Sequence, residues 1–94
     1  MKPLERLTRD YRTAFLRYLP RREEAPLHQA YEIGRAALGE GVSLLELARV
    51  HHEVLFEVLR DTPNEELGRV NTAASEFLLE ALSAYDMIQR GLLE

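Results

Sequence analysis

The chain has 94 residues, a net charge of -4 and no cysteine. A domain of this length buries only about 60–65% of its unfolded surface, so its stability is modest unless a partner adds area. The lack of cysteine excludes disulfides, thiol catalysis and thiolate metal sites, and no stretch approaches the roughly 18 to 20 apolar residues of a membrane span. We therefore expect residues 1–94 to form one soluble domain in a reducing, cytoplasmic setting, away from the membrane.

Charge is unevenly distributed along the chain. Residues 1–22 carry seven basic and two acidic groups, a balance of +5, whereas the remainder carries five basic and fourteen acidic groups, a balance of -9. The chain as a whole is acidic, and its basic residues are not interleaved with aromatic ones as in RNA-binding modules. We therefore expect no nucleic-acid partner and interpret the arginines of the first segment as a solvated helix face.

Apolar residues that recur every three or four positions predict the first two helices. One helix spans about 4–19 and stops at Pro20, and the next spans about 26–38 with Pro26 near its start. Gly34 lies on the inner stripe of the second helix, where a glycine costs about 1 kcal/mol relative to alanine, so we expect it to serve close helix packing. The predicted inner stripes are Leu4, Leu7, Tyr11, Ala14, Phe15, Tyr18 and Leu19 in the first helix, and Leu27, Ala30, Tyr31, Gly34 and Ala37 or Leu38 in the second.

Two capping signals predict the starts of the other two helices. Ser43 and Glu46 have the spacing of a capping box, and a helix from there reaches about residue 60. Thr62 and Glu65 repeat that spacing and begin a fourth helix, which reaches about residue 90, before Gly91. Four helices with short connections predict an all-α fold, an antiparallel four-helix bundle.

Two leucines fall outside the inner stripes. The stripe of the fourth helix runs through Leu67, Val70, Ala74, Phe77, Leu78, Ala81 and Tyr85. Leu79 is left beside Ser75, Glu76 and Ser83, and Leu16 lies off the stripe of the first helix. Apolar side chains outside the core predict contacts with other proteins. We expect a homodimer, with the first helix as the leading candidate for its interface, and a second protein at Leu79.

Residues that suggest chemistry have simpler structural explanations. His51 and His52 are adjacent and point about 100° apart on a helix, so they do not share a metal ion easily; His51 lies in line with apolar residues, as a hydrogen-bonded core histidine does. The carboxylate pairs at Glu53/Glu57 and Glu76/Glu80 lack the histidines of metal-binding bundles, and Ser43, Ser75 and Ser83 lack the sequence context of a nucleophile. We therefore expect no catalytic residue, no metal and no cofactor.

Several short motifs occur in order along most of the chain. They are Tyr11 with Leu16-Arg17-Tyr18-Leu19, Leu27-His28-Gln29-Ala30-Tyr31 with Arg35, Val50-His51 with Val54-Leu55, Glu76-Phe77-Leu78-Leu79-Glu80, and Tyr85-Asp86-Met87. In this order the motifs resemble the N-terminal domain of RsbU, the serine phosphatase that regulates the bacterial general stress response. Ala84 and His28 depart from residues that relatives often carry at those positions.

The resemblance implies a small, non-catalytic helical domain that forms homodimers. In RsbU such a domain precedes a metal-dependent, PPM-type phosphatase domain, and the switch kinase RsbT binds it and turns the phosphatase on. The positions that match the kinase-docking groove are Glu24, His28 and Leu79. The chain would then be the receiving domain excised from a longer protein. Two alternatives are a dimerising input module of a histidine kinase or other signalling protein, and a small metal-dependent or ligand-binding helical protein.

Overall fold

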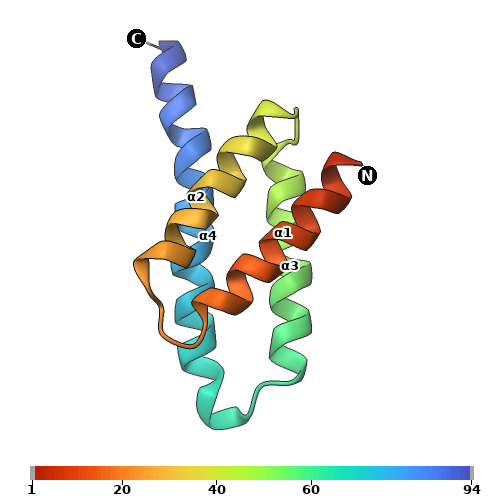
Figure 1. Ribbon diagram of the computed structural model, residues 1–94, viewed down its shortest axis with the longest axis vertical. Helices are drawn as coiled ribbons and strands as arrows, with labels where there is room; N and C mark the ends of the chain where they lie inside the picture. The colour runs from red at the N-terminus through yellow and green to blue at the C-terminus, as the bar shows by residue number, and fades with distance from the viewer. Residues whose placement is uncertain (1, 94) are drawn as a thin grey trace.

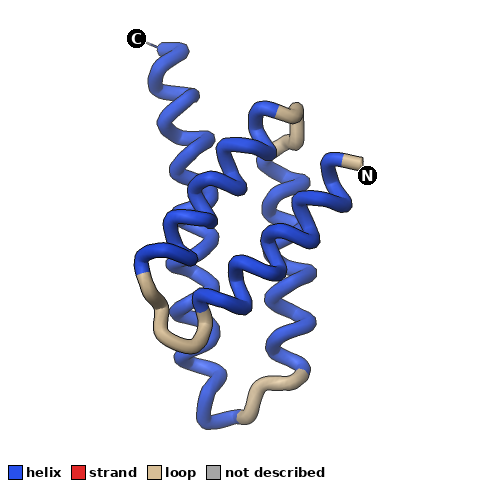
Figure 2. The backbone as a smooth tube through the Cα atoms, in the orientation of Figure 1, coloured by secondary structure: helices blue, strands red, loops and turns tan. Residues whose placement is uncertain are grey.

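The computed structural model describes residues 2–93, and the all-α prediction is confirmed. The elements in chain order are α1 (Pro3–Tyr18), α2 (Glu24–Gly39), α3 (Leu44–Arg60), a short 3-10 helix η1 (Asn64–Glu66) and α4 (Leu67–Leu93). Short loops join them, and the described part of the chain contains no strand (Figure 2).

The four helices form two layers, each made of two consecutive helices. In the view of Figure 1, α1 and α2 lie in front of α3 and α4. The most extensive contact joins α2 to α4, and α1 also packs on α3. The molecule measures 45 × 28 × 20 Å, and the last turns of α4 project beyond the other helices (Figure 1). Each layer therefore has one face in the core and one face turned outward.

The core is built around Phe77 of α4, which is fully buried. Its ring centroid lies 5.0 Å from that of Tyr11, 5.4 Å from that of Phe15 and 5.9 Å from that of Tyr18, all of α1. These side chains belong to the stripes predicted from helical spacing. Because aromatic rings bury large areas, this cluster contributes much of the apolar contact between α1 and α4.

Gly34 lies where α2 and α4 approach most closely. A methyl group at this position would lie 3.0 Å from the carbonyl carbon of Ala81 and closer still to the carbonyl oxygen. Backbone atoms cannot move aside as a flexible side chain can, so only glycine permits this approach.

Three predicted helix boundaries were wrong. The second helix begins at Glu24, before Pro26, because proline is tolerated in the first turn, where its missing N–H has no intrahelical acceptor. Thr62 does not cap the last helix: its hydroxyl donates to the carbonyl of Val58, 2.6 Å away, and the chain enters α4 through η1. The helix also continues past Gly91 to Leu93, since glycine weakens a helix without necessarily ending it.

Two leucines near helix starts are exposed, and one of them, Leu4, had been assigned to an inner stripe. Leu4 lies in the first turn of α1 and Leu44 is the first residue of α3, and both side chains are more than two-fifths exposed. Helical spacing gives the direction of a side chain, but burial also requires another element to cover it. At the starts of α1 and α3, neighbouring elements cover these leucines only in part.

Candidate functional site

The predicted partner-binding residues lie on α2 and α4, the two helices that contact each other most. Glu24 and His28 are exposed on α2, and Leu79 is 64% exposed on α4. Leu79 is two residues from the buried Ala81 and therefore points about 160° away from it around the helix. No hydrogen bond or ion pair joins the three predicted residues to one another in the described part of the chain.

Tyr31 and Met87 connect these two helices at the edge that carries His28. The His28 ring stacks on the Tyr31 ring, with centroids 6.1 Å apart and planes 22° apart. The Tyr31 hydroxyl lies 3.6 Å from the sulfur of Met87, and Met87 itself is exposed. Sequence reasoning did not include Tyr31 or Met87 among the binding residues. The four-residue steps from Leu79 to Ser83 to Met87 are the signal that could have pointed to Met87.

His51 is buried and paired with Tyr11, which joins α3 to α1. The Tyr11 hydroxyl and the His51 Nδ1 are 2.7 Å apart. Burial raises the pKa of Tyr11 and lowers the pKa of His51 to about 4, with the neighbouring His52 as a smaller cause for the histidine. Both groups are therefore neutral at pH 7. Because a phenol O–H is a stronger acid than an imidazole N–H, we assign the hydroxyl as donor and Nδ1 as acceptor.

The carboxylates considered as metal ligands take part in contacts between helices. Glu57 of α3 accepts two hydrogen bonds from Arg12 of α1, at 2.9 and 3.0 Å, and these bonds lower the pKa of Glu57. Glu76 of α4 accepts from Tyr18 at 2.8 Å and from Arg22 at 3.1 Å. No group of three or more potential metal ligands occurs within residues 2–93.

Ser43 begins α3 through two reciprocal hydrogen bonds. Its hydroxyl accepts from the backbone N–H of Glu46 at 3.1 Å, and the Glu46 side chain accepts from the backbone N–H of Ser43 at 3.0 Å. These bonds lower the pKa of Glu46. The serine is thereby committed to capping the helix.

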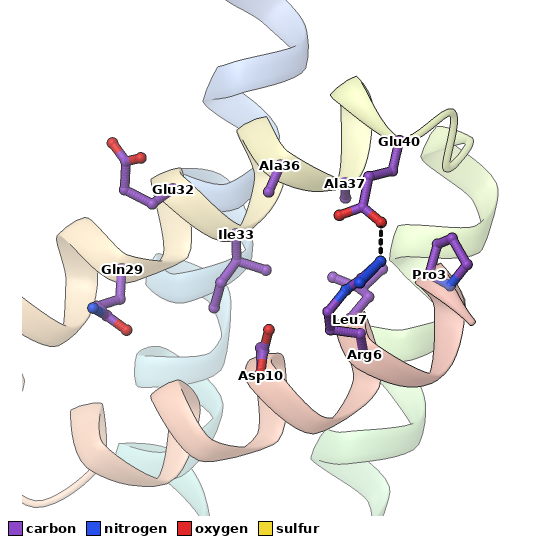
Figure 3. Close-up of a pocket in the computed structure, with 10 residues that line it drawn as sticks. All are labelled: Pro3, Arg6, Leu7, Asp10, Gln29, Glu32, Ile33, Ala36, Ala37 and Glu40. Atoms are coloured by element: carbon purple, nitrogen blue, oxygen red, sulfur yellow. Dashed lines mark hydrogen bonds and ion pairs between the residues drawn. The ribbon is translucent and has the colours of Figure 1, made fainter. Parts of the chain in front are cut away.

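A pocket of about 260 Å³ lies between α1 and α2, with apolar side chains such as Leu7 and Ile33 among its lining residues (Figure 3). Its four charged lining residues take part in the pairs Arg6–Glu40, Asp10–Arg9 and Glu32–His28. Because Arg6, Glu40 and Asp10 already pair with opposite charges within the chain, the pocket offers little that would select a charged ligand.

Comparison with known families gives one match. The model described as "Phosphoserine phosphatase RsbU, N-terminal domain" matches residues 9–88, which is most of the chain and confirms the resemblance seen in the sequence. Neither the curated proteins nor the solved structures contain a match to the chain. In the described residues, no helix has the length and apolar character needed to cross a membrane.

Proposed function

Because this chain belongs to the family of the N-terminal domain of the phosphoserine phosphatase RsbU, we propose that it homodimerises and binds an RsbT-like switch kinase. As the N-terminal regulatory domain of an RsbU-type phosphatase, it has no catalytic role of its own. We propose that its four helices act as one antiparallel bundle in the cytoplasm and that kinase binding controls a PPM-type serine/threonine phosphatase in bacterial stress signalling. The family match over residues 9–88 is the observation that carries this proposal.

Leu79 is the residue that we propose as the centre of the kinase-binding surface. Its side chain is 64% exposed and is flanked in the sequence by Glu76, Glu80 and Ser83. An apolar side chain surrounded by polar ones is the usual composition of a binding hot spot, where one truncation can reduce affinity by about 2 kcal/mol or more. Glu24 and His28 would supply polar contacts from α2.

One histidine and two carboxylates that could suggest catalysis already serve the fold, which supports a regulatory role. His51 is buried against Tyr11, and Glu57 and Glu76 are paired with side chains of the α1–α2 layer and its loop. A general acid or base must instead reach a substrate in a cleft.

The test is Leu79→Glu, measured by titration with an RsbT-like switch kinase. We expect the affinity to fall at least about thirtyfold, which corresponds to roughly 2 kcal/mol, because a carboxylate would be placed in a desolvated contact. The helical circular dichroism, the melting temperature and the dimer mass should stay nearly unchanged, since the side chain is exposed.

Leu16→Glu is the matched control. It introduces the same charge at another exposed leucine, on α1, and should leave kinase affinity unchanged. If Leu79→Glu unfolds the domain or splits the dimer while kinase affinity survives, Leu79 belongs to the core or to the dimer interface, and the proposed kinase surface is wrong.

A further inference from the structure

The end of α1 and the loop that follows it are held against α4 at two points (Figure 1). One oxygen of the Glu76 carboxylate accepts from the Tyr18 hydroxyl at 2.8 Å, and the other accepts from the Arg22 guanidinium at 3.1 Å. Two turns earlier on α4, the Arg69 guanidinium donates to the backbone carbonyl of Leu19 at 2.7 Å. We call these three contacts the loop clasp.

Arg22 has an unusual backbone conformation. Its φ is +50°, and it is the one residue other than glycine with a positive φ within residues 2–93. Its backbone N–H donates to the carbonyl of Tyr18 at 2.8 Å, which closes the turn after α1. Glycine adopts this left-handed conformation at no steric cost, whereas arginine does not. What the arginine adds over a glycine is a side chain that reaches Glu76.

The start of α2 has few other restraints. Its N-cap residue, Glu23, makes no side-chain capping hydrogen bond. Leu27 is only partly buried against the core, and the first buried residue of α2, Ala30, lies six residues after Glu24, about 9 Å along the helix. The loop clasp therefore limits how far the first turn of α2 can move relative to α4.

The loop clasp lies between the two sides of the proposed kinase-binding surface. On α4, Glu76 comes three residues before Leu79, which places it about 60° away around the helix and about 4.5 Å away along it. On the other side, Arg22 comes two residues before Glu24, the first residue of α2. The Arg22–Glu76 pair thus forms a short connection between Glu24 and Leu79.

We propose that Arg22 is a positioning residue for kinase binding: through its pair with Glu76 it holds the start of α2 in a fixed position relative to the Leu79 turn of α4. This inference rests on the proposed function and adds a residue that acts without touching the kinase. A partner that contacts both helices loses affinity when they move independently, because binding must then order them.

Arg22→Gly is the test, measured by titration of the whole chain with an RsbT-like switch kinase. We expect the affinity to fall about tenfold, since the two sides of the surface are no longer held together. The melting temperature should stay nearly unchanged, because glycine suits the positive φ and an ion pair this exposed contributes little to stability. Arg22→Lys keeps a cation for Glu76 and should retain most of the affinity.

Arg21→Gly is the matched control. It removes the same charge from the neighbouring residue, whose side chain is 80% exposed and pairs with Glu23 at 3.9 Å rather than with α4. Its affinity should stay within about twofold of wild type, as for an ordinary surface change. An equal loss in Arg21→Gly and Arg22→Gly would show that only the charge of the loop matters, which overturns the positioning role.

A double-mutant comparison tests whether Arg22 acts through α2. In a chain that already carries Glu24→Ala and His28→Ala, the contacts that Arg22 positions are gone, so Arg22→Gly should lower the affinity further by less than about threefold. A full tenfold loss in that background would show that Arg22 touches the kinase itself.

Distance measurements test the loop clasp without a kinase. The chain has no cysteine of its own, so Glu24→Cys and Leu79→Cys give two unique sites for spin labels. Mixing with an excess of unlabelled chain restricts the measured distances to one chain. Arg22→Gly should broaden the distribution of distances between the labels, whereas Arg21→Gly should leave it unchanged.

The possible failures are distinguishable. An unchanged distance distribution in Arg22→Gly overturns the loop clasp as a positioning device. A broadened distribution with unchanged kinase affinity overturns its role in kinase binding and leaves the proposed function intact. A wild-type chain that binds no RsbT-like kinase overturns the proposed function, and the distances then decide whether Arg22 positions the start of α2.

Discussion

The two layers of the domain differ in what their outward sides present. Eight large apolar side chains are exposed in the described part of the chain: two on α1, none on α2, three on α3 and three on α4. The exposed side of α2 carries Glu24, His28, Glu32 and Arg35 instead. Water therefore solvates the α2 surface well, whereas the α3–α4 layer keeps apolar area that only another protein surface can bury. The α1–α2 layer thus exposes two large apolar side chains and the α3–α4 layer six, so more of the apolar area that a partner could bury lies on the second layer.

Among the changes considered, substitution at the contact between α2 and α4 should lower the stability of the fold most. Gly34→Ala places a methyl group against the backbone of Ala81, so we expect the free energy of unfolding to fall by about 3 kcal/mol and the melting temperature by more than about 10 °C. Gly39→Ala is the control, because that position has nothing within 4 Å and alanine favours a helix. If Gly34→Ala is as stable as Gly39→Ala, α2 and α4 do not pack as closely as the structure shows.

Acidification should weaken the other junction between the layers, the Tyr11–His51 pair. The pKa of His51 is lowered to about 4 in the folded chain, so between pH 6.5 and 4 the unfolded chain binds a proton that the folded chain does not. Stability from this group is fully present above pH 6.5 and falls as the pH drops, by about 2 kcal/mol at pH 5. Chemical denaturation at pH 7.5 and pH 5 measures this loss.

His51→Ala is the variant that isolates the contribution of this histidine. At pH 7.5 it should lower the free energy of unfolding by roughly 1 to 3 kcal/mol, through a cavity and the loss of a partner for Tyr11. It should also remove most of the loss between pH 7.5 and pH 5. His52→Ala, on the exposed side of the same helix, should keep most of the pH dependence, because burial is the larger cause of the lowered pKa of His51. A chelator that shifts the wild-type melting temperature would instead support metal binding.

The smallest effect is expected at the start of α3, in the layer with the apolar outer face. Ser43→Ala removes a hydroxyl that caps the helix and should lower the free energy of unfolding by about 1 kcal/mol, as measured by thermal melting. Ser75→Ala, at an exposed position within α4, should change it by less than about 0.5 kcal/mol. Equal effects of the two changes would show that the cap contributes nothing beyond an ordinary surface hydroxyl.

Much of the candidate site could be predicted because it depends on helical spacing. The exposure of Leu79 and Leu16 follows from their positions off the inner stripes, and the structure agrees. The exposure of Leu45 and Phe56 on α3 was not predicted from the sequence. A helix that is apolar on most sides gives no sign in its own sequence of which apolar side chains will be covered.

The sequence by itself determined the four helices, most of the inner stripes and the family. These depend on residue spacing and on local chemistry, such as a serine three residues before a glutamate. Only the tertiary structure decided which helices touch, because that depends on segments far apart in the chain. It paired Tyr11 with His51, 40 positions away, and brought Gly34 close to the backbone of Ala81. It also left Leu4 and Leu44 exposed at helix ends and one face of α3 uncovered, since burial requires a neighbouring element as well as the right direction.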